Sequence, residues 1–387
     1  MNQIEAKIIK LIDENRETIL EFGRDIYNHA ELGYKEFRTS GKFVEFMEKR
    51  NLPVTKDLAI TGAKAYLNRE KAENVSLALL GELDALRIPQ HAHANPETQA
   101  AHCCGHHTQM AGVIGAALAL NDPEVAAALD GQVIFFAVPA EEYGEVEFKN
   151  TLIAENKIQY GGGKCELLRI GAFEDISLCL AHHTGYNGIS FGSGSGNGFV
   201  SKVIRMKGKA AHAAGCPEKG VNALSAASLG LQALGLNRET FRDEDCVRVH
   251  PIMTKGGDLV NVVPDDVVEI AREVFGSDKV SEADLTAHSG GSTDVGDVQH
   301  RMPVLTFHTG GATGGLHQVD FDIVDEEEAY ITTAKLFALS AYRLLRNGAA
   351  CAKQVVNDYK PRFASREEYV AFMDAFNKVE EKIRKVY

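Results

Sequence analysis

Side chains that can bind a metal ion occur at four places where a buried strand of this 387-residue chain is expected to end. These places hold Cys104 with His106, Glu141 with Glu142, His182 with His183, and His317. A lone histidine beside glycine is more often structural than a ligand. In open α/β sheets, however, ligand sites lie beyond the carboxyl ends of the strands, so groups that follow different strands converge. The four places together therefore predict a metal site.

Glu141 and Glu142 are the pair that is hardest to explain without a cation. They directly follow an apolar run, and two adjacent carboxylates at the edge of a core repel each other unless a cation lies between them. Successive side chains leave an extended chain on opposite sides, so both cannot easily bind one ion. We expect one carboxylate to bind metal and the other to take a proton from a metal-bound water. This pattern predicts a metal-assisted hydrolase with a carboxylate general base.

The donor types indicate which metal is bound and how many ions there are. Cysteine, histidine and carboxylate together suit zinc, cobalt, manganese or nickel better than calcium or magnesium. Five candidate ligands exceed the four of a tetrahedral zinc site, so we expect two divalent ions about 3.5–4 Å apart. Asp84 precedes the loop that carries Cys104 and can hold a ligand imidazole by its second nitrogen. The alternative role of Asp84 is to cap a helix.

The elements that must position these groups alternate between strands and helices. Short apolar runs at 75–80, 133–138, 176–180 and 304–308 predict buried strands, and helical periodicity is present at 1–28, 110–120, 326–346 and 366–387. The pattern predicts an α/β fold, with a mostly parallel sheet covered by helices. A Gly/Ser-rich stretch at 192–198 precedes a strand–helix–strand–strand order. We expect a catalytic domain built from 1–198 and 288–387, with a small βαββ domain inserted at 199–287.

Charge and composition exclude several classes of protein. A formal net charge of -13 argues against a nucleic-acid binder, which would present a basic face. The longest nearly uncharged apolar stretch, 110–120, is far shorter than the ~20 residues that cross a bilayer, and the N-terminal segment does not have the pattern of a secretory signal. Seven scattered cysteines fit a reducing compartment. We therefore expect a cytoplasmic protein with no membrane or nucleic-acid partner.

Six motifs in order along the chain resemble the amidohydrolase branch of the aminoacylase/carboxypeptidase metallopeptidase family. They are Gly81-Glu-Leu-Asp-Ala-Leu, His102-Cys-Cys-Gly-His, Val138-Pro-Ala-Glu-Glu, Gly208-Lys-Ala-Ala-His-Ala-Ala, Val260-Asn-Val-Val-Pro-Asp and Gly291-Ser-Thr-Asp-Val-Gly-Asp-Val. The resemblance spans about residues 25 to 345. Within that branch the chain is most similar to p-aminobenzoyl-glutamate hydrolases, and it also resembles indole-acetyl-amino-acid and hippurate hydrolases.

The resemblance implies a two-metal amidase that cleaves an N-acyl or N-aroyl amino acid, or a dipeptide, and that forms a homodimer through the small domain. Glu141 matches the general base of the family. His212 and Asn261 match small-domain residues that help to bind substrate across the dimer interface, and His212 could polarise the scissile carbonyl. The positions that match metal ligands are Cys104, His106, Glu142, His182 and His317.

Three features depart from the family pattern. His107 follows the Cys-Gly-His triplet where relatives often carry Asp or Asn, so it is either an extra ligand or a bystander. His182 and His183 are adjacent, and spacing cannot choose between them; the family pattern favours His182. The small domain is short, because only about fifteen residues separate Phe275 from Gly291. The register of Arg272, which resembles a substrate-carboxylate arginine, is therefore open.

Two other functions remain open from the sequence alone. A dipeptidase would use the same two metals on a substrate with a free amino group. An inactive relative would bind metal and serve as a scaffold. The intact Glu141 beside intact ligands argues against the second, because a lost activity would be expected to strike the base early.

Overall fold

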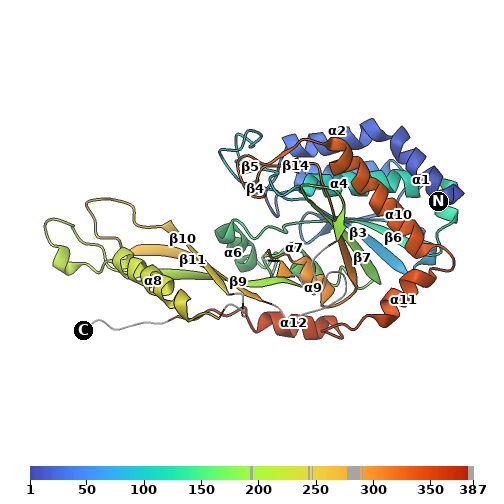
Figure 1. Cartoon of the computed structure of the whole chain (residues 1–387). Helices are drawn as coiled ribbons and strands as arrows, with labels where there is room; N and C mark the ends of the chain where they lie inside the picture. Colours follow the sequence, from blue (N-terminus) through green and yellow to red (C-terminus); the bar gives the residue numbers. More distant parts are fainter. Residues whose placement is uncertain (192–194, 243–244, 246, 277–287, 290, 382–387) are drawn as a thin grey trace. The chain divides into compact units, whose positions relative to one another are not determined.

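A computed structural model describes residues 1–191, 195–242, 245, 247–276, 288–289 and 291–381 (Figure 1). The chain divides into two compact units. The large unit comprises Met1–Gly192 and Asp294–Tyr387, and the small unit comprises Ser193–Thr293. The predicted inserted domain, 199–287, falls within the small unit. Among the described residues, no helix combines the length and the apolar character needed to cross a bilayer.

The large unit is built on a seven-stranded sheet in the order β1-β2-β6-β3-β7-β13-β8. The four neighbouring strands β6, β3, β7 and β13 are parallel, and β1, β2 and β8 pair antiparallel at the edges. The bounds are β1 (Val54–Leu58), β2 (Gly62–Leu67), β3 (Ser76–Glu82), β6 (Gln132–Val138), β7 (Leu178–Thr184), β8 (Ser190–Phe191) and β13 (Val304–Thr309). The predicted α/β architecture with a mostly parallel sheet is confirmed.

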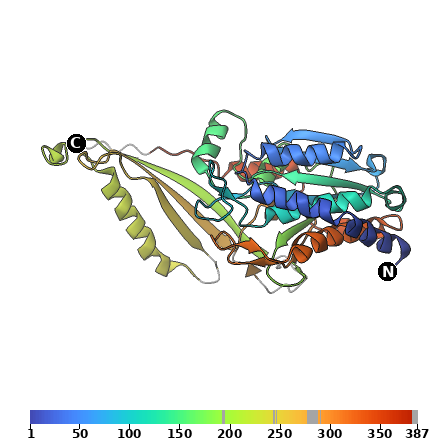
Figure 2. The same ribbon diagram turned by 90° about the horizontal axis from the view of Figure 1, so that it is seen from above.

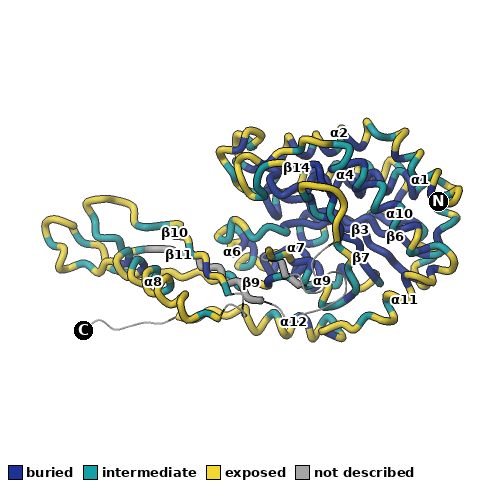
Figure 3. Tube along the Cα trace, viewed as in Figure 1, coloured by how far each residue is buried: buried dark blue, intermediate teal, exposed yellow. Residues whose placement is uncertain are grey.

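Alternate side chains of the central strands enter two different hydrophobic cores. On β3, Leu77 and Leu79 belong to one core, whereas Ala78 and Leu80 belong to the other. Because successive side chains of a strand point to opposite faces, both faces of this sheet must be covered. Helices lie on both sides of the sheet in Figure 2. The burial is deepest along the central strands and α4, which are dark blue in Figure 3.

Each core has its own set of helices. The first core contains residues of α1 (Gln3–Glu14), α2 (Arg16–Asn28), α3 (Phe37–Glu48), α4 (His106–Leu120), α5 (Pro123–Ala127), α10 (Thr333–Leu345) and α11 (Ala350–Asp358). The second core contains residues of α6 (Val146–Ala154), α7 (Gly163–Arg169), α9 (Val295–Gln299) and α12 (Arg366–Asp374). Thus α4, which begins at the predicted ligand His106, lies in the first core with its start at the carboxyl end of β3.

Two predicted helices are shorter than expected. The single helix expected over 1–28 is divided at Asn15, whose side-chain amide donates to the carbonyl of Leu11 and thereby satisfies an acceptor at the end of α1. The helix expected over 366–387 ends at Asp374, and its last residues, 382–387, lie outside the described residues. The helix expected over 326–346 begins with a π-helical segment, Glu327–Thr332, before α10.

The small unit contains strand, helix, strand and strand in the predicted order. They are β9 (Ser195–Lys207), α8 (Ala223–Asn237), β10 (Arg248–Lys255) and β11 (Asp266–Gly276), and a short β12 (His288–Ser289) follows. The sheet order is β10-β11-β9-β12, with β12 parallel to β9 and the other pairs antiparallel. Ala223 and Ala227 of α8 pack near Met206 and Met253. The segment where a further helix was expected to be missing, 277–287, lies outside the described residues.

Helix α4 can approach α10 closely because it carries glycine at the contact. A Cβ added at Gly115 would lie 2.5 Å from Cβ of Ala334 and 2.9 Å from Cδ1 of Ile19. We expect Gly115→Leu to lower the free energy of unfolding by about 1–3 kcal/mol, because it overpacks this contact. Gly41, in α3, has no atom within 4 Å of the corresponding Cβ position.

Gly41→Ala serves as the control for the Gly115 variant. It should raise the free energy of unfolding by about 0.5–1 kcal/mol, because alanine is the better helix former and meets no neighbour. Urea unfolding followed by circular dichroism measures both changes. A Gly115→Leu protein that is as stable as the wild type would contradict the close packing of α4 on α10.

Candidate metal centre

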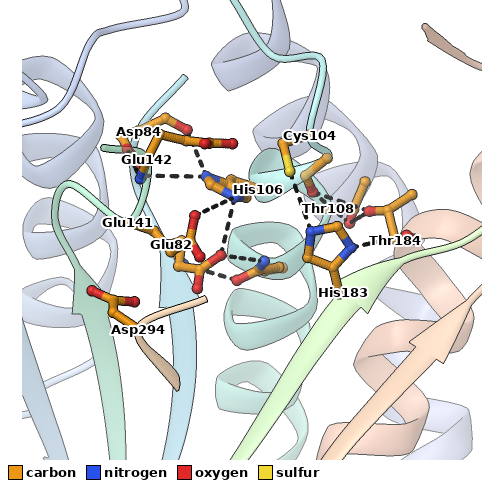
Figure 4. Close-up of polar contacts among 12 residues, drawn as sticks. Glu82, Asp84, Cys104, His106, Thr108, Glu141, Glu142, His183, Thr184 and Asp294 are labelled. Carbon is orange, nitrogen blue, oxygen red and sulfur yellow. Dashed lines mark hydrogen bonds and ion pairs between the residues drawn. The ribbon is translucent and has the colours of Figure 1, made fainter. Parts of the chain in front are cut away.

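Side chains at the carboxyl ends of three parallel strands meet the start of α4 in the large unit (Figure 4). Glu82 ends β3, His183 lies near the end of β7, and α4 begins at His106. Three groups of side chains have ligand atoms that all lie within 4.8 Å of one another: Cys104 with His106 and His183; Cys104 with Glu142 and His317; and Glu82 with His106 and Glu141.

Cys104 lies at the centre of two of these groups. Its Sγ is 3.2 Å from Nε2 of His183 and 3.2 Å from Nε2 of His317. Nε2 of His317 is also 3.0 Å from Oε1 of Glu142. A thiolate shared between two groups of ligands can contact two ions at once. The structure thus brings together four of the five predicted ligands, and His317 joins them although it is distant in sequence.

The hydrogen bonds of two histidines determine which ring nitrogen faces the centre. Nδ1 of His106 is 2.8 Å from the main-chain oxygen of Asp84, and Nδ1 of His183 is 3.0 Å from that of Thr184. A carbonyl oxygen only accepts, so each Nδ1 carries the hydrogen, and each Nε2 of a neutral ring presents a lone pair. Oδ1 of Asp84 also lies 3.2 Å from Nδ1 of His106. The role of Asp84 in orienting that ring stays a prediction.

The converging lone pairs fit a divalent metal ion. Within the described part of the chain, neither Nε2 of His106 nor Oε1 of Glu142 has a hydrogen-bond partner, although both atoms are buried. Buried polar atoms without a partner are unusual and indicate an unoccupied interaction. Imidazole, thiolate and carboxylate are also the donors that zinc and neighbouring transition metals prefer.

The charges of the acidic side chains are not balanced without a cation. Burial raises the pKa of Glu141 well above its usual range, and the nearby Glu82 and Glu142 raise it further. Burial and Glu142 likewise raise the pKa of the Cys104 thiol well above its usual range. Burial also raises the pKa of Glu142, but the hydrogen bond and charge of His317 outweigh it and lower the pKa overall. A bound cation would favour the ionised form of all three groups.

The backbone around Glu141 is held on both sides by buried carboxylates. The amide of Ala140 donates to Oε1 of Glu36 at 2.8 Å, and the amide of Glu142 donates to Oδ2 of Asp84 at 2.9 Å. Ala140 has φ +47°, in the left-handed region that is unfavourable for a residue with a side chain. Its carbonyl accepts from the amide of Gly163 at 2.9 Å. These hydrogen bonds fix the turn that carries Glu141 and Glu142.

Sequence reasoning did not find Glu36. It is fully buried, and its second oxygen accepts from Oγ1 of Thr61 at 2.7 Å. The contact with Ala140 joins residues 104 positions apart, and Glu36 lies just before α3 in a polar stretch that resembles any other loop. The sequence contains no local signal for such a distant contact.

The structure corrects the choice between the two adjacent histidines. His182 points away from Cys104: its Nε2 is 2.7 Å from Oγ1 of Thr309, and its ring lies 5.2 Å from that of Phe307. Because neighbouring side chains of β7 point to opposite faces, only one of the pair can face the centre. That residue is His183, and it replaces His182 in the proposed set of ligands.

His107 is packed behind the centre. It is fully buried, and its ring lies 4.8 Å from that of Tyr27, 5.2 Å from that of His102 and 5.7 Å from that of Tyr330. Burial lowers the pKa of His107 well below its usual range, so the ring is neutral. Among the described residues, it belongs to none of the groups that could hold a metal ion. Its position favours a bystander over an extra ligand.

His212 and Asn261 lie close together within the small unit. The amide of Ala213 donates to the carbonyl of Asn261 at 3.0 Å, and His212 bridges to Val262. Nδ1 of the exposed His212 accepts from the amide of Gly215 at 3.0 Å, so Nε2 carries the hydrogen. In β11, Arg272 is paired with His250 of β10 and Ser201 of β9. The substrate-binding roles of His212 and Asn261 stay predictions.

A known family and several curated proteins are similar to this chain. The family described as Peptidase family M20/M25/M40 matches residues 78–343. The Xaa-Arg dipeptidase of Mus musculus is 29% identical over 274 residues, which are 67% of this chain and 56% of that protein. An IAA-amino acid hydrolase of Arabidopsis thaliana, ILR1-like 4, is 28% identical over 283 residues, 69% of this chain and 58% of that protein.

A bacterial relative extends this range of named substrates. One of the polypeptides of the p-aminobenzoyl-glutamate hydrolase of Escherichia coli is 26% identical over 266 residues, 67% of this chain and 51% of that protein. The chain therefore spans little more than half the length of the curated relatives that it matches.

Two solved structures share the fold. A dinuclear metal-binding peptidase of Bacillus subtilis has a TM-score of 0.58 at 20% identity, and the match covers 86% of this chain and 99% of that one. The aminobenzoyl-glutamate utilization protein of Klebsiella pneumoniae has a TM-score of 0.60 at 18% identity, with 88% and 99% covered.

Substitution of each histidine of the adjacent pair tests which one binds metal. His183→Ala removes an Nε2 that faces Cys104, so we expect metal affinity to fall by more than the roughly 10–100-fold that loss of an outer hydrogen-bond partner costs. His182→Gln should leave the number of bound ions unchanged and lower only the stability, because His182 contacts Thr309 and Phe307. Metal analysis after dialysis against a weak chelator measures both. The reverse result would restore His182 as the ligand.

Glu36 offers a test that depends on pH in the metal-free protein. Burial and the nearby Asp84 raise the pKa of Glu36 from 4.5 to about 7. Because the folded pKa is the higher one, the contribution of Glu36 to stability is fully present below about pH 4.5 and is lost as the pH rises through about 7. Glu36→Gln has no such titration, so the wild type should lose stability relative to it over this range.

Glu36→Ala provides the comparison for hydrogen bonding. It leaves the amide of Ala140 without its acceptor, which should cost about 1–3 kcal/mol, whereas glutamine can still accept from that amide. Urea unfolding between pH 5 and 8 measures both effects. If the stability difference between the wild type and Glu36→Gln does not change with pH, the raised pKa is wrong.

Proposed function

Because the chain belongs to Peptidase family M20/M25/M40, we propose that it is a two-metal amidohydrolase. It cleaves the amide bond of an N-acyl or N-aroyl amino acid of the p-aminobenzoyl-glutamate type. The observation that carries this proposal is the convergence of His183 and His317 on Cys104, each at 3.2 Å. Glu141 lies beside these ligands and outside both groups that share Cys104. Two relatives named as hydrolases of amino-acid conjugates support the class of substrate.

The proposed ligands form two sets that share the thiolate of Cys104. One ion is held by Cys104, His106 and His183, and the other by Cys104, Glu142 and His317. The donor types favour zinc, manganese, cobalt or nickel. When bound, such ions polarise a carbonyl oxygen and lower the pKa of a water molecule. Every other step falls to side chains of the protein.

Glu141 is the proposed general base. Its carboxylate takes a proton from the attacking water as the new C–O bond forms, and then gives that proton to the amine nitrogen as the C–N bond breaks. The products are a carboxylic acid and a free amino acid. Oε2 of Glu141 lies 4.0 Å from Nε2 of His106, so the base is next to the ligands. The backbone contacts of Ala140 and Glu142 hold it there.

The small unit is proposed to bind the substrate. Nε2 of the exposed His212 carries a hydrogen that can be donated to the carbonyl oxygen as negative charge develops on it. Asn261, which lies beside it, can add a contact from its amide. Strand β10 lies at an edge of the small-unit sheet as the described residues form it, which suits pairing with a second copy of the chain across a two-fold axis. We propose a homodimer on this basis.

Dipeptide hydrolysis is the second candidate. The Xaa-Arg dipeptidase of Mus musculus resembles this chain at 29% identity, as closely as the hydrolases of conjugates do. Such an enzyme would use the same metal ligands and the same base. It differs only in a site for the free amino group of the substrate.

A panel of N-acyl amino acids, N-aroyl glutamates and dipeptides, assayed with each of the four metals, tests the proposal. We expect the wild type to hydrolyse N-acyl or N-aroyl amino acids, and Glu141→Gln to lose about 10²–10⁴-fold in kcat while it keeps both ions, because it lacks the base. Hydrolysis of dipeptides alone would favour the second candidate. If the wild type cleaves neither, it is not an amidohydrolase. Near-normal activity of Glu141→Gln would show that the base lies elsewhere, and activity that survives chelation would refute the metal mechanism.

A further inference from the structure

Glu82 is a buried carboxylate that the mechanism above does not use. It ends β3 and has only 5% of its surface exposed. Its two oxygens have different neighbours (Figure 4). Oε1 lies 2.5 Å from Nζ of Lys164, and Oε2 lies 3.1 Å from Nε2 of His106. One side of this carboxylate therefore faces a cation of the protein, and the other faces the candidate metal centre.

The contact between Glu82 and His106 joins two acceptors. Nδ1 of His106 donates its hydrogen to the main-chain oxygen of Asp84, so Nε2 of the neutral ring presents a lone pair. Oε2 of Glu82 also presents a lone pair, and Nε2 of His106 has no hydrogen-bond partner among the described residues. Two facing lone pairs at 3.1 Å repel each other unless a proton or a cation lies between them.

Three other contacts fix Glu82 in this orientation. The side chain of Gln109, one turn after His106 in α4, accepts from the amide of Glu82 at 3.0 Å and donates to its Oε2 at 2.7 Å. Lys164, which is fully buried, also contacts Oδ1 of Asp294 at 2.6 Å. The carboxylate is thus held before any metal binds, which is what a preorganised ligand requires.

We propose that Glu82 is a further ligand, through Oε2, of the ion that His106 binds. This inference rests on the proposed metal centre and adds a residue to it. The ion bound by Cys104, His106 and His183 would gain Glu82 as a fourth protein ligand. Because Oε1 is engaged by Lys164, Glu82 binds through one oxygen only. The positive charge of Lys164 offsets part of the negative charge that Glu82 adds beside Glu141.

The rival explanation is that Glu82, Lys164 and Asp294 form a purely structural ion triad. Such a triad would join β3 to the start of α7 and to the residue before α9. In that case Glu82 contacts His106 only when the ring carries two hydrogens. The two explanations differ in what happens to metal binding when the triad is disturbed from its other end.

Two isosteric variants separate the explanations. Glu82→Gln removes the charged ligand, and Asp294→Asn disturbs the same contact with Lys164 but leaves Glu82 in place. Titration with Co²⁺ and the visible absorption spectrum of the bound ion measure the number of sites, their affinities and their geometry. We expect the wild type to bind two Co²⁺ per chain. Glu82→Gln should weaken one site at least tenfold and alter its spectrum, whereas Asp294→Asn should keep both sites and the spectrum.

Several outcomes would overturn the inference. Glu82→Gln with wild-type affinities and spectrum would show that Glu82 is no ligand. Equal losses in both variants would show that the triad acts only through structure. If Glu82→Gln does not fold, Glu82→Gln with Lys164→Met removes the unpaired buried charge and repeats the test. A crystal structure of the Zn²⁺-loaded wild type needs no variant: Oε2 should lie about 2.0–2.2 Å from an ion, and a distance beyond about 3 Å refutes the inference.

These results are independent of the proposed hydrolysis. A wild type that binds two ions but cleaves no amide contradicts the proposed function and leaves the ligand role of Glu82 to be judged by the titration. A wild type that binds no ion contradicts the metal centre itself, and with it the inference.

Discussion

The structure of the large unit depends on a concentration of buried acceptors at the carboxyl ends of its parallel strands. Glu82, Glu141 and Glu142 lie there beside the thiol of Cys104, and burial makes charge on these groups expensive. Lys164 offsets part of that charge. The remaining imbalance raises the pKa of Glu141 and Cys104 and leaves Nε2 of His106 without a partner among the described residues. A metal ion that satisfies these atoms also stabilises the fold, because its ligands are assembled only in the folded chain.

Precise backbone turns deliver these side chains. Gly105, between Cys104 and His106, has φ +83°, and a Cβ at this position would lie 2.1 Å from Oγ1 of Thr184. Only glycine combines this conformation with this proximity, so α4 can begin directly against β7. The turn after β6 is strained at Ala140 and is held by Glu36. Strain of this kind persists where the surroundings fix it, and it concentrates at functional sites.

The sequence was sufficient for the architecture and for most of the ligands. Alternating apolar strands and helices predicted the parallel sheet, and the residue types at the strand ends predicted where Cys104, Glu142 and His317 meet. It could not choose between His182 and His183, because that choice depends on which face of β7 each side chain occupies. It also could not find Glu36 and Lys164, whose partners lie 104 and 130 positions away. Contacts of that range are set by the packing of distant elements, and no local pattern encodes them.

The same metal chemistry serves several substrates, so the choice of substrate must come from other side chains. Proteins named for a dipeptide, an indole-acetyl conjugate and p-aminobenzoyl-glutamate resemble this chain at 29%, 28% and 26% identity. Such similar values do not favour one acyl group over another. Metal ligands and a general base act on the amide group, which all these substrates share. Discrimination requires contacts to the parts of the substrate that differ. His212 and Asn261 are exposed in the small unit, where such contacts can vary without disturbing the buried centre.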